Sequence, residues 1–210
     1  MSRCQTRTNR CRLRDRLQAT VASMGRDLRI IDPDSIYHVV SCGSNRGPIA
    51  WDQHDFESLS RDLAAAAVLY AWEVFAWCAM TTHHHVVVRT PAKGFSPGFQ
   101  LLNGNHARRT NRRHGREAHL FKNRPFVRPV DSDAYLTTAV LYVVRNPVEA
   151  GVCPHASHWP HSSYRATVGL AEPPPWLNVD ALHELFGGPA EFARLVHDGH
   201  LPVSDTNGSR

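Results

Sequence analysis

The alternation of apolar and polar residues predicts several strands and helices in the middle of the chain. Period-two or continuous apolar runs bounded by turn residues predict strands over 35–42, 72–80 and 83–89. Between the first two strands, apolar residues recur at helical spacing and predict a helix over 54–71. The residues that define this helical stripe are Phe56, Leu59, Leu63, Ala66 and Tyr70.

The second half of the domain continues with elements of both kinds. We expect a helix over 96–113, then a strand over 120–130 at a sheet edge, because its prolines cannot donate ladder hydrogen bonds. A further helix is expected over 132–145, closed by Pro147. The order strand–helix–strand–strand–helix–strand–helix predicts an α+β fold of ferredoxin-like type, an antiparallel sheet with helices packed on it.

The two ends of the chain differ in composition from this domain. Residues 1–23 are rich in arginine and lack apolar periodicity, so we expect a basic, disordered arm, with Met24 as an alternative translation start. Residues 24–171 form the predicted domain. After the segment EPPPW, residues 172–210 are expected to form a small acidic helical tail. We hypothesise that this tail folds over the basic part of the domain and restricts access to it.

Cysteine usage and hydropathy limit the class of protein. The five cysteines are scattered and include no CxxC pair, which argues against a zinc ribbon or a disulfide framework. The most apolar window, 63–80, is interrupted by Glu73 and fits a helix followed by a strand better than a membrane span. The arginine-rich N-terminus does not resemble a secretory signal. We therefore expect a cytoplasmic protein without a membrane partner.

Positive charge is concentrated in two segments of the chain. Residues 1–31 contain eight arginines against Asp15 and Asp27, and residues 89–128 contain ten Lys and Arg against the single Glu117. So many like charges within one segment repel one another, and a bound phosphate backbone would relieve that repulsion. The pattern predicts a polyanionic partner, above all nucleic acid, and hence association with the nucleoid.

Three consecutive histidines stand at the start of the strand expected over 83–89, in the stretch MTTHHHVVVRTP. Side chains alternate between the two faces of a strand, so His83 and His85 project together while His84 points to the opposite face. Two imidazoles on one face can share a divalent metal, with a third ligand from elsewhere. The same geometry argues against a zinc hydrolase that uses all three histidines.

The last predicted helix of the domain carries a tyrosine and an amide one turn apart. Tyr142 and Asn146 are spaced i, i+4 and therefore lie on one side of the helix. They flank the apolar stripe formed by Leu136, Ala139, Val140 and Val143. A single tyrosine is more often a packing residue. Here the amide one turn away, the histidine pair and the basic segment together favour a catalytic role.

Taken together, these blocks resemble the IS200-like, single-tyrosine HUH transposases, and most closely their REP-associated tyrosine transposase branch. The resemblance covers roughly residues 30–170. It rests on several blocks in the same order as in the family: IYHVVSCGSNRG, WCAMTTHHHVVV, LLNGNHARRTNRRHG, HLFKNRPFVRPVDSDAYL, LYVVRNPVEAG and HWPHSSYRA.

The resemblance implies a metal-dependent endonuclease and strand transferase that acts on single-stranded DNA at hairpin-associated sites. His83 and His85 would be metal ligands, with Asn146 as the third, and Tyr142 would be the nucleophile that forms a 5′-phosphotyrosine. The family implies Mg²⁺ or Mn²⁺ as the cofactor. It also implies a monomer rather than a helix-exchanged dimer.

Single-stranded or hairpin DNA is expected to run along the basic segment. Crowded arginines on the helix over 96–113 and at its exit would contact the phosphates. The turn GSNRG would place two more polar residues beside the DNA. The expected contacts are Asn45, Arg46, Arg108, Arg109, Arg112, Arg113, Arg116, Lys122 and Arg124.

Three other classes of protein stay open at this point. A replication-initiator nickase or a relaxase shares the histidine pair, although relaxases place the tyrosine before the histidines. A non-catalytic nucleic-acid-binding module would expose aromatics at the sheet centre, where this chain has histidines. A catalytically impaired, domesticated hairpin-binding protein fits a further feature: His84 stands where the family has a bulky apolar residue, and Thr81–Thr82 replace its Pro-Asn.

Overall fold

The computed structural model describes residues 31–199, so the predicted arm over 1–23 and Met24 lie outside the described residues. A four-stranded sheet forms the centre of the domain, in the order β2-β3-β1-β4, with every neighbouring pair antiparallel. The strands are β1 (Ile36–Cys42), β2 (Glu73–Ala79), β3 (His83–Arg89) and β4 (Phe126–Val130). This order confirms the ferredoxin-like α+β prediction.

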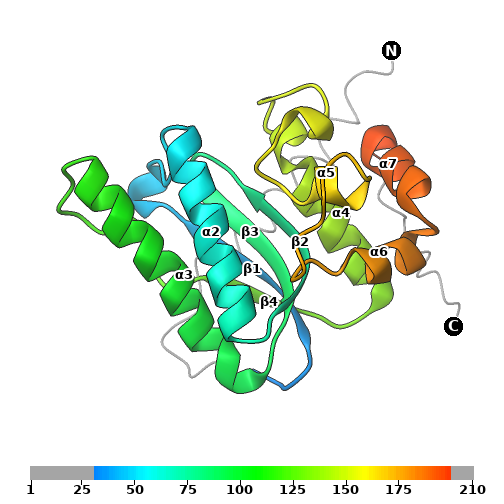
Figure 1. Ribbon diagram of the computed structural model, residues 1–210, viewed down its shortest axis with the longest axis horizontal. Helices are drawn as coiled ribbons and strands as arrows, with labels where there is room; N and C mark the ends of the chain where they lie inside the picture. Colours follow the sequence, from blue (N-terminus) through cyan, green and yellow to red (C-terminus); the bar gives the residue numbers. More distant parts are fainter. Residues whose placement is uncertain (1–30, 200–210) are drawn as a thin grey trace, which may run out of the picture. The chain divides into compact units, whose positions relative to one another are not determined.

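Two helices cover one face of the sheet (Figure 1). They are α2 (Gln53–Leu69), which confirms the helix predicted over 54–71, and α3 (Ala92–Arg113). Helix α3 begins four residues earlier than predicted and runs through Pro97 and Gly98. Gly98 fits because the helix passes very close to the sheet: a Cβ there would lie 2.3 Å from Cζ2 of Trp72. The glycine therefore marks a close approach and not a helix end.

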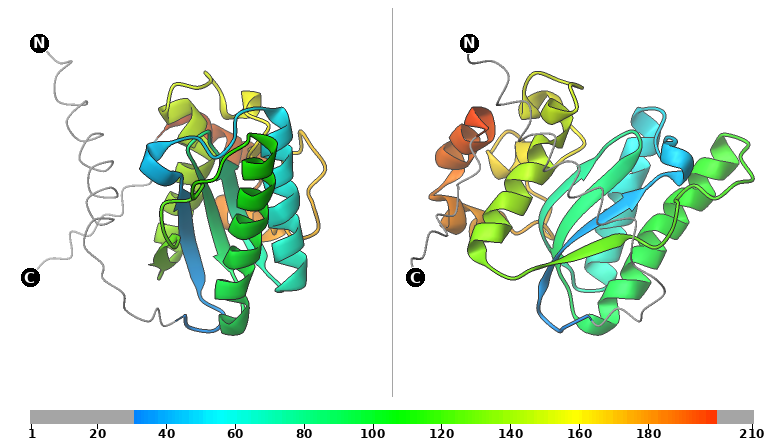
Figure 2. Two further views of the ribbon diagram at one scale, coloured as in Figure 1. Left: turned by 90° about the vertical axis from the view of Figure 1, so that its left-hand side faces the viewer. Right: turned by 180° about the vertical axis from the view of Figure 1, so that it is seen from behind.

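The opposite face of the sheet is covered by α4 (Asp133–Glu149) (Figure 2). Ser132 caps its start by accepting a hydrogen bond from the Tyr135 N–H at 3.3 Å. The prediction that Pro147 closes this helix was wrong, because α4 continues to Glu149. Pro147 removes one donor in the last turn, but the Ala150 N–H still bonds to the Asn146 carbonyl at 2.9 Å and closes that turn. Asn146 is thus held within regular helix.

The edge strand β4 is shorter than the predicted strand over 120–130. Residues 120–125 form a loop, in which Phe121 makes an isolated bridge to Gly43. β4 does lie at the sheet edge, as its prolines predicted, and Pro129 is paired opposite Tyr37 of β1. The loop lies beside the turn after β1, which contains the short 3₁₀ helix η2 (Ser44–Arg46).

The C-terminal part packs on α4 (Figure 1). It contains the short elements η3 (Ala156–His158) and α5 (Tyr164–Thr167), followed by α6 (Val179–Phe186) and α7 (Pro189–Asp198). Leu182, Phe186 and Phe192 are buried in one apolar cluster with residues of α4 and β2. The helical character of the tail is confirmed up to Gly199, but the hypothesis that it covers the basic segment is wrong for its described residues. Between residues 31 and 199, no helix is long and apolar enough to cross a membrane.

Candidate active site at one end of the sheet

The three histidines divide between the two faces of β3, as strand alternation predicts. His84 lies on the face covered by α2 and α3, where its Nε2 is 2.8 Å from Oδ1 of Asn103. The amide of Asn103 in turn donates to Oγ of Ser41 at 2.9 Å. His84 therefore takes part in packing α3 on the sheet, and it does not disturb the face that carries His83 and His85.

His83 and His85 meet Asn146 of α4 on the other face. The Nε2 atom of His83 is 3.3 Å from Oδ1 of Asn146, and the Nε2 atom of His85 is 3.3 Å from Nδ2 of the same side chain. One nitrogen of each imidazole thus points at a single amide. The contact joins residues more than sixty positions apart in sequence, and it brings the three predicted metal ligands together.

Tyr142 lies one helical turn before Asn146 and beside the same histidines. Its ring centroid is 5.5 Å from that of His85, in an edge-to-face arrangement, and 6.0 Å from that of His38. The tyrosine is partly buried on the sheet-facing side of α4. The i, i+4 spacing therefore places the predicted nucleophile and the amide ligand at one site, as the sequence indicated.

His38 of β1 belongs to this site and was missed by the sequence analysis. It is only 3% exposed, and its Nε2 lies 3.0 Å from Nδ1 of His85. In the strand register, His38 is paired with Val87 and Val40 with His85, so the two histidines are diagonal neighbours on adjacent strands. The sequence motif IYHVV contains this histidine, but only the register between β1 and β3 shows what it contacts.

Burial favours the neutral form of two imidazoles of this site, those of His85 and His38. It lowers the pKa of His85 well below the usual value, and the neighbouring histidines add to the effect. Burial, together with the positive charge of Arg128, lowers the pKa of His38 to about 4. Neutral imidazole is the form that binds metal. If His85 uses Nε2 as a ligand, its Nδ1–H donates to Nε2 of His38, which fixes the ring orientation.

The donor set fits a divalent metal of intermediate softness. The two imidazole nitrogens favour softer ions than Mg²⁺, whereas the amide oxygen of Asn146 is a ligand that suits Mg²⁺ or Mn²⁺. No group of three or more His, Cys, Asp or Glu side chains is placed to hold a metal among residues 31–199. The candidate site therefore depends on the amide of Asn146 as its third protein ligand.

The turn GSNRG and the loop before β4 lie at the same end of the sheet as His83. Cys42, the last residue of β1, pairs with His83, and its carbonyl accepts from the Lys122 N–H at 2.9 Å. Asn45 and Arg46 follow in the turn with φ of 52° and 57°, and Lys122 and Arg124 are exposed. The structure thus brings four predicted DNA contacts to the end of the sheet where β3 begins.

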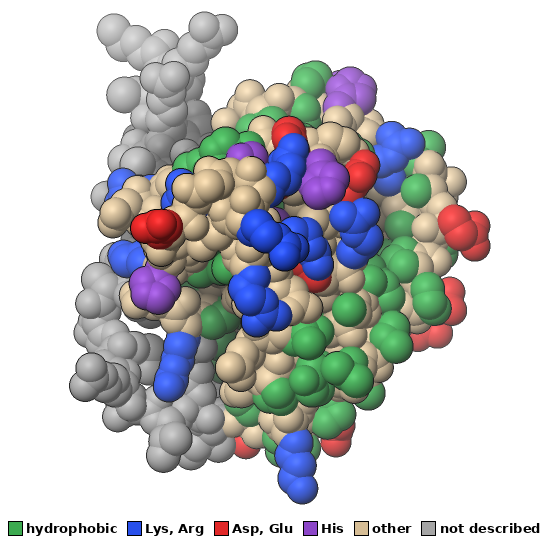
Figure 3. Space-filling view, turned by 60° about the vertical axis from the view of Figure 1, so that its left-hand side comes forward, with side chains coloured by type: hydrophobic (Ala, Val, Ile, Leu, Met, Phe, Trp, Pro, Cys, Tyr) green, Lys and Arg blue, Asp and Glu red, His purple; other side chains and the backbone are tan. Residues whose placement is uncertain are grey.

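The basic half of α3 extends past this end of the sheet. Asn103 is level with His84, and the ten residues from there to Arg113 span about 15 Å at the rise of an α-helix. Figure 3 shows Lys and Arg side chains gathered on the face of the molecule to which α3 contributes. Arg108 and Arg112 are exposed on this part of the helix, and Arg112 has no ion pair with any described residue.

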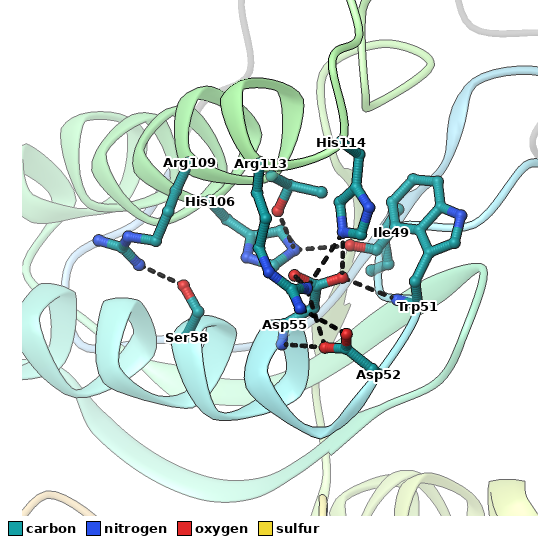
Figure 4. A network of polar contacts seen from close by, with 10 residues as sticks. Ile49, Trp51, Asp52, Asp55, Ser58, His106, Arg109, Arg113 and His114 are labelled. Carbon is teal, nitrogen blue, oxygen red and sulfur yellow. Dashed lines mark hydrogen bonds and ion pairs between the residues drawn. The ribbon is translucent and has the colours of Figure 1, made fainter.

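Two of the predicted DNA contacts instead join α3 to α2 (Figure 4). Arg109 forms hydrogen bonds of 3.0 and 3.2 Å with the carboxylate of Asp62. Arg113 reaches Asp52 at 2.6 Å and Asp55 at 2.7 Å. The charge repulsion inferred from the sequence is therefore partly relieved within the protein. The acidic partners lie about fifty to sixty residues earlier in the chain, where local charge counting cannot detect them.

Comparison with known proteins gives a matching family model and a solved structure with a similar fold. The family model described as IS200-like transposase matches residues 33–146. The fold is similar to the structure of the REP-associated tyrosine transposase bound to a REP hairpin, with a TM-score of 0.59 and 17% sequence identity over 72% of this chain and 89% of that chain. A candidate transposase from Deinococcus radiodurans R1 matches with a TM-score of 0.40 and 20% identity, over 55% of this chain and 92% of that one. No curated protein sequence matches this chain.

Proposed function

The chain belongs to the IS200-like transposase family, and we propose that it is a metal-dependent endonuclease and strand transferase for single-stranded DNA. The observation that carries this proposal is the convergence of His83, His85 and Asn146, with Tyr142 one helical turn away. In this proposal a nucleophile, a set of metal ligands and a basic surface meet at one end of the sheet.

In the proposed reaction the phenolic oxygen of Tyr142 attacks a DNA phosphate. The phenol loses its proton, the bond from phosphorus to the 3′ oxygen breaks, and that oxygen takes up a proton and leaves as a free 3′-hydroxyl. The product is a 5′-phosphotyrosine. Attack by the 3′-hydroxyl of another end reverses the step and joins the two strands, so the energy of the phosphodiester bond is retained and no nucleotide cofactor is needed.

A phenol is a weak nucleophile at neutral pH and needs an activated phosphate. A divalent ion held by His83, His85 and Asn146, Mg²⁺ or Mn²⁺ by family membership, would polarise the scissile phosphate as a Lewis acid. His38 and the α4 backbone hold these groups in place before the substrate binds, so little ordering is required at the moment of reaction.

The proposed substrate is single-stranded DNA next to a hairpin, as in the REP-hairpin complex of the structural neighbour. Side chains at the sheet end and on the projecting part of α3 would contact its phosphates. We assign this role to Asn45, Arg46, Arg108, Arg112, Arg116, Lys122 and Arg124. Arg109 and Arg113 have their main role between α2 and α3.

We further propose that the protein acts as a monomer. Helix α4, which carries Tyr142 and Asn146, packs against the sheet on one side and against α6 and α7 of the same chain on the other. The guanidinium of Arg145 also donates to the Val196 carbonyl of α7. These contacts support a helix that stays with its own sheet and completes the site within one chain.

The test uses a labelled hairpin oligonucleotide with single-stranded flanks, taken from the DNA next to the gene, in the presence of Mn²⁺ or Mg²⁺. We expect a protein–DNA adduct on a denaturing gel for the wild type and none for Tyr142→Phe or His85→Ala. An adduct with Tyr142→Phe would identify another nucleophile and contradict the mechanism. If the wild type binds the hairpin but forms no adduct, the result would instead indicate a non-catalytic hairpin-binding protein.

A further inference from the structure

Trp51 is the exposed member of the five tryptophans, all of which lie within residues 31–199. It follows the turn after β1 and immediately precedes the N-cap of α2, and 39% of its surface is accessible. The other four are buried or half-buried. A ligand that covers this indole would remove apolar surface from water, which favours binding.

Several contacts fix the indole of Trp51 in place. Its backbone N–H donates to Oδ2 of Asp55 at 2.9 Å, and the same carboxylate oxygen is 2.8 Å from Nε2 of His114 (Figure 4). The imidazole of His114 stacks on the indole, with ring centroids 4.6 Å apart and a tilt of 30°. The ring is therefore ordered before any ligand arrives, which lowers the entropic cost of binding.

A cation with no carboxylate partner lies over the same ring. The guanidinium carbon of Arg116 is 5.1 Å from the indole centroid. Unlike Arg113, Arg116 makes no ion pair with any described residue, and its Nε–H has no hydrogen-bond acceptor. An ordered aromatic ring beside an uncompensated cation is the combination that proteins use to hold a base and its phosphate.

Trp51 lies near the end of the sheet where β3 begins. The N–H of Ala50 lies 3.3 Å from the carbonyl oxygen of Thr81, two residues before His83. Chain geometry then limits the Cα separation of Trp51 and His83 to about 17 Å. This upper limit corresponds to no more than about five nucleotides at the spacing of about 3.4 Å found in one strand of a duplex, and to fewer along a more extended single strand.

We propose that Trp51, with His114 and Arg116, forms a stacking site for an unpaired nucleobase of the DNA substrate, a few nucleotides from the scissile phosphate. This inference rests on the proposed function. The base stacks on the indole, and the guanidinium of Arg116 moves from the ring to the adjacent phosphate, where its Nε–H gains an acceptor. The site thus selects DNA with a single-stranded flank, because a paired base cannot offer its face to the indole.

The test is an abasic scan of the flanks of the hairpin oligonucleotide. Affinity is measured by fluorescence anisotropy with EDTA present, in the Tyr142→Phe background, so that no cleavage occurs. With Trp51 intact, we expect one flanking position at which loss of the base weakens binding by about 5- to 100-fold. With Trp51→Leu, binding of the complete oligonucleotide should fall by a similar factor, and the same abasic substitution should have no further effect.

Matched variants distinguish a stacking role of Trp51 from a packing role and from the effect of the charge of Arg116. Trp51→Phe keeps a ring and should retain most of the affinity, whereas Trp176→Leu, a half-buried tryptophan near the edge strand β2, should leave binding unchanged. Arg116→Ala should reduce the slope of log affinity against log salt by about 0.7, the value for one phosphate contact on a single strand, and Trp51→Leu should not. Thermal unfolding checks that each variant is folded.

Three results would overturn the proposal. The first is equal affinity of the Trp51→Leu and Trp51-intact proteins, and the second is an abasic effect that persists unchanged in Trp51→Leu. The third is a loss of affinity on Trp51→Leu that is equally large for a blunt hairpin, which has no single-stranded flank, and for the flanked hairpin. In each of these cases the Trp51-intact protein still binds the hairpin, and the wild type can still form the adduct. Failure of the proposed function looks different, because then the wild type forms no adduct or does not bind the hairpin at all.

Discussion

The Nε2 atom of His38 lies 3.0 Å from Nδ1 of His85, so a buried histidine of β1 fixes the ring of a proposed metal ligand on β3. The two rings are also stacked, with centroids 5.2 Å apart. Hydrogen bonds of this kind to the second nitrogen of a metal-bound imidazole select its tautomer and raise its basicity. In the proposed metal site, His38 would thus be a positioning residue that acts only through His85.

We expect His38→Ala to weaken Mn²⁺ binding by about 10- to 100-fold, the usual effect of losing such a partner. Isothermal titration calorimetry with Mn²⁺ measures this directly. His38→Gln, which can offer an acceptor to the Nδ1–H of His85, should recover part of the affinity, and His38→Phe should not. Equal Mn²⁺ affinities in all four proteins would show that His38 has a packing role alone.

Arg109 and Arg112 are neighbours on α3, but we expect Arg109 to contribute to stability and Arg112 to contribute to DNA binding. Asp62 is buried, with a side chain only 5% exposed, and Arg109 is its ion-pair partner at 3.0 Å. Arg109→Gln should therefore lower the free energy of unfolding by about 1–3 kcal/mol, a figure moderated by the partial exposure of the arginine. Urea denaturation measures the loss.

Arg112→Gln is the matched control for this pair. Arg112 is exposed and has no ion pair with a described residue, so its replacement should change stability by less than about 0.5 kcal/mol. It should, however, weaken hairpin binding and reduce the salt slope by about 0.7–0.9. A large stability loss in Arg112→Gln, or none in Arg109→Gln, would contradict this division of roles.

Two glycines of α3 give a second matched pair. A Cβ at Gly98 would lie 2.3 Å from the Trp72 indole, so Gly98→Ala should destabilise the protein by about 1–3 kcal/mol through overpacking. Nothing lies within 4 Å of a Cβ at Gly104, and Gly104→Ala should add about 0.5–1 kcal/mol through helix propensity. Thermal melts of both variants test the pair, and shifts of the same sign would refute the close approach of α3 to Trp72.

His106 should make stability depend on pH. Its Nε2–H donates to the Ile49 carbonyl at 2.7 Å, and its buried Nδ1 has no partner. Burial lowers its pKa below 6.5, so the unfolded chain binds a proton more readily than the folded one. The free energy of unfolding should therefore fall as the pH decreases below about 6.5, and the contribution of this group should be constant above that range.

Urea unfolding at about pH 7.5 and about pH 5.5 measures this effect. His106→Gln retains a donor for the Ile49 carbonyl but cannot take up a proton, so it should lose less stability than the wild type between the two pH values. His119→Gln, at an exposed position, should behave like the wild type. An identical pH dependence of His106→Gln and wild type would assign the effect to other groups.

The sequence alone determined the features that depend on local periodicity. Alternation along β3 placed His83 and His85 on one face and His84 on the other. The helical repeat placed Tyr142 and Asn146 one turn apart, and the order of apolar segments predicted the ferredoxin-like sheet. These properties follow from backbone geometry within one element, which neighbouring residues largely fix.

The tertiary structure decided everything that depends on which distant segments meet. Strand register, set by packing of the whole sheet, brought His38 to His85. Packing of α3 against α2 paired Arg109 with Asp62, so that part of the basic segment stabilises the fold. The tail was found on α4 because its apolar side chains, Phe186 and Phe192 among them, complete the core there. Burial of apolar surface outweighed the attraction between an acidic tail and a basic helix that charge alone had suggested.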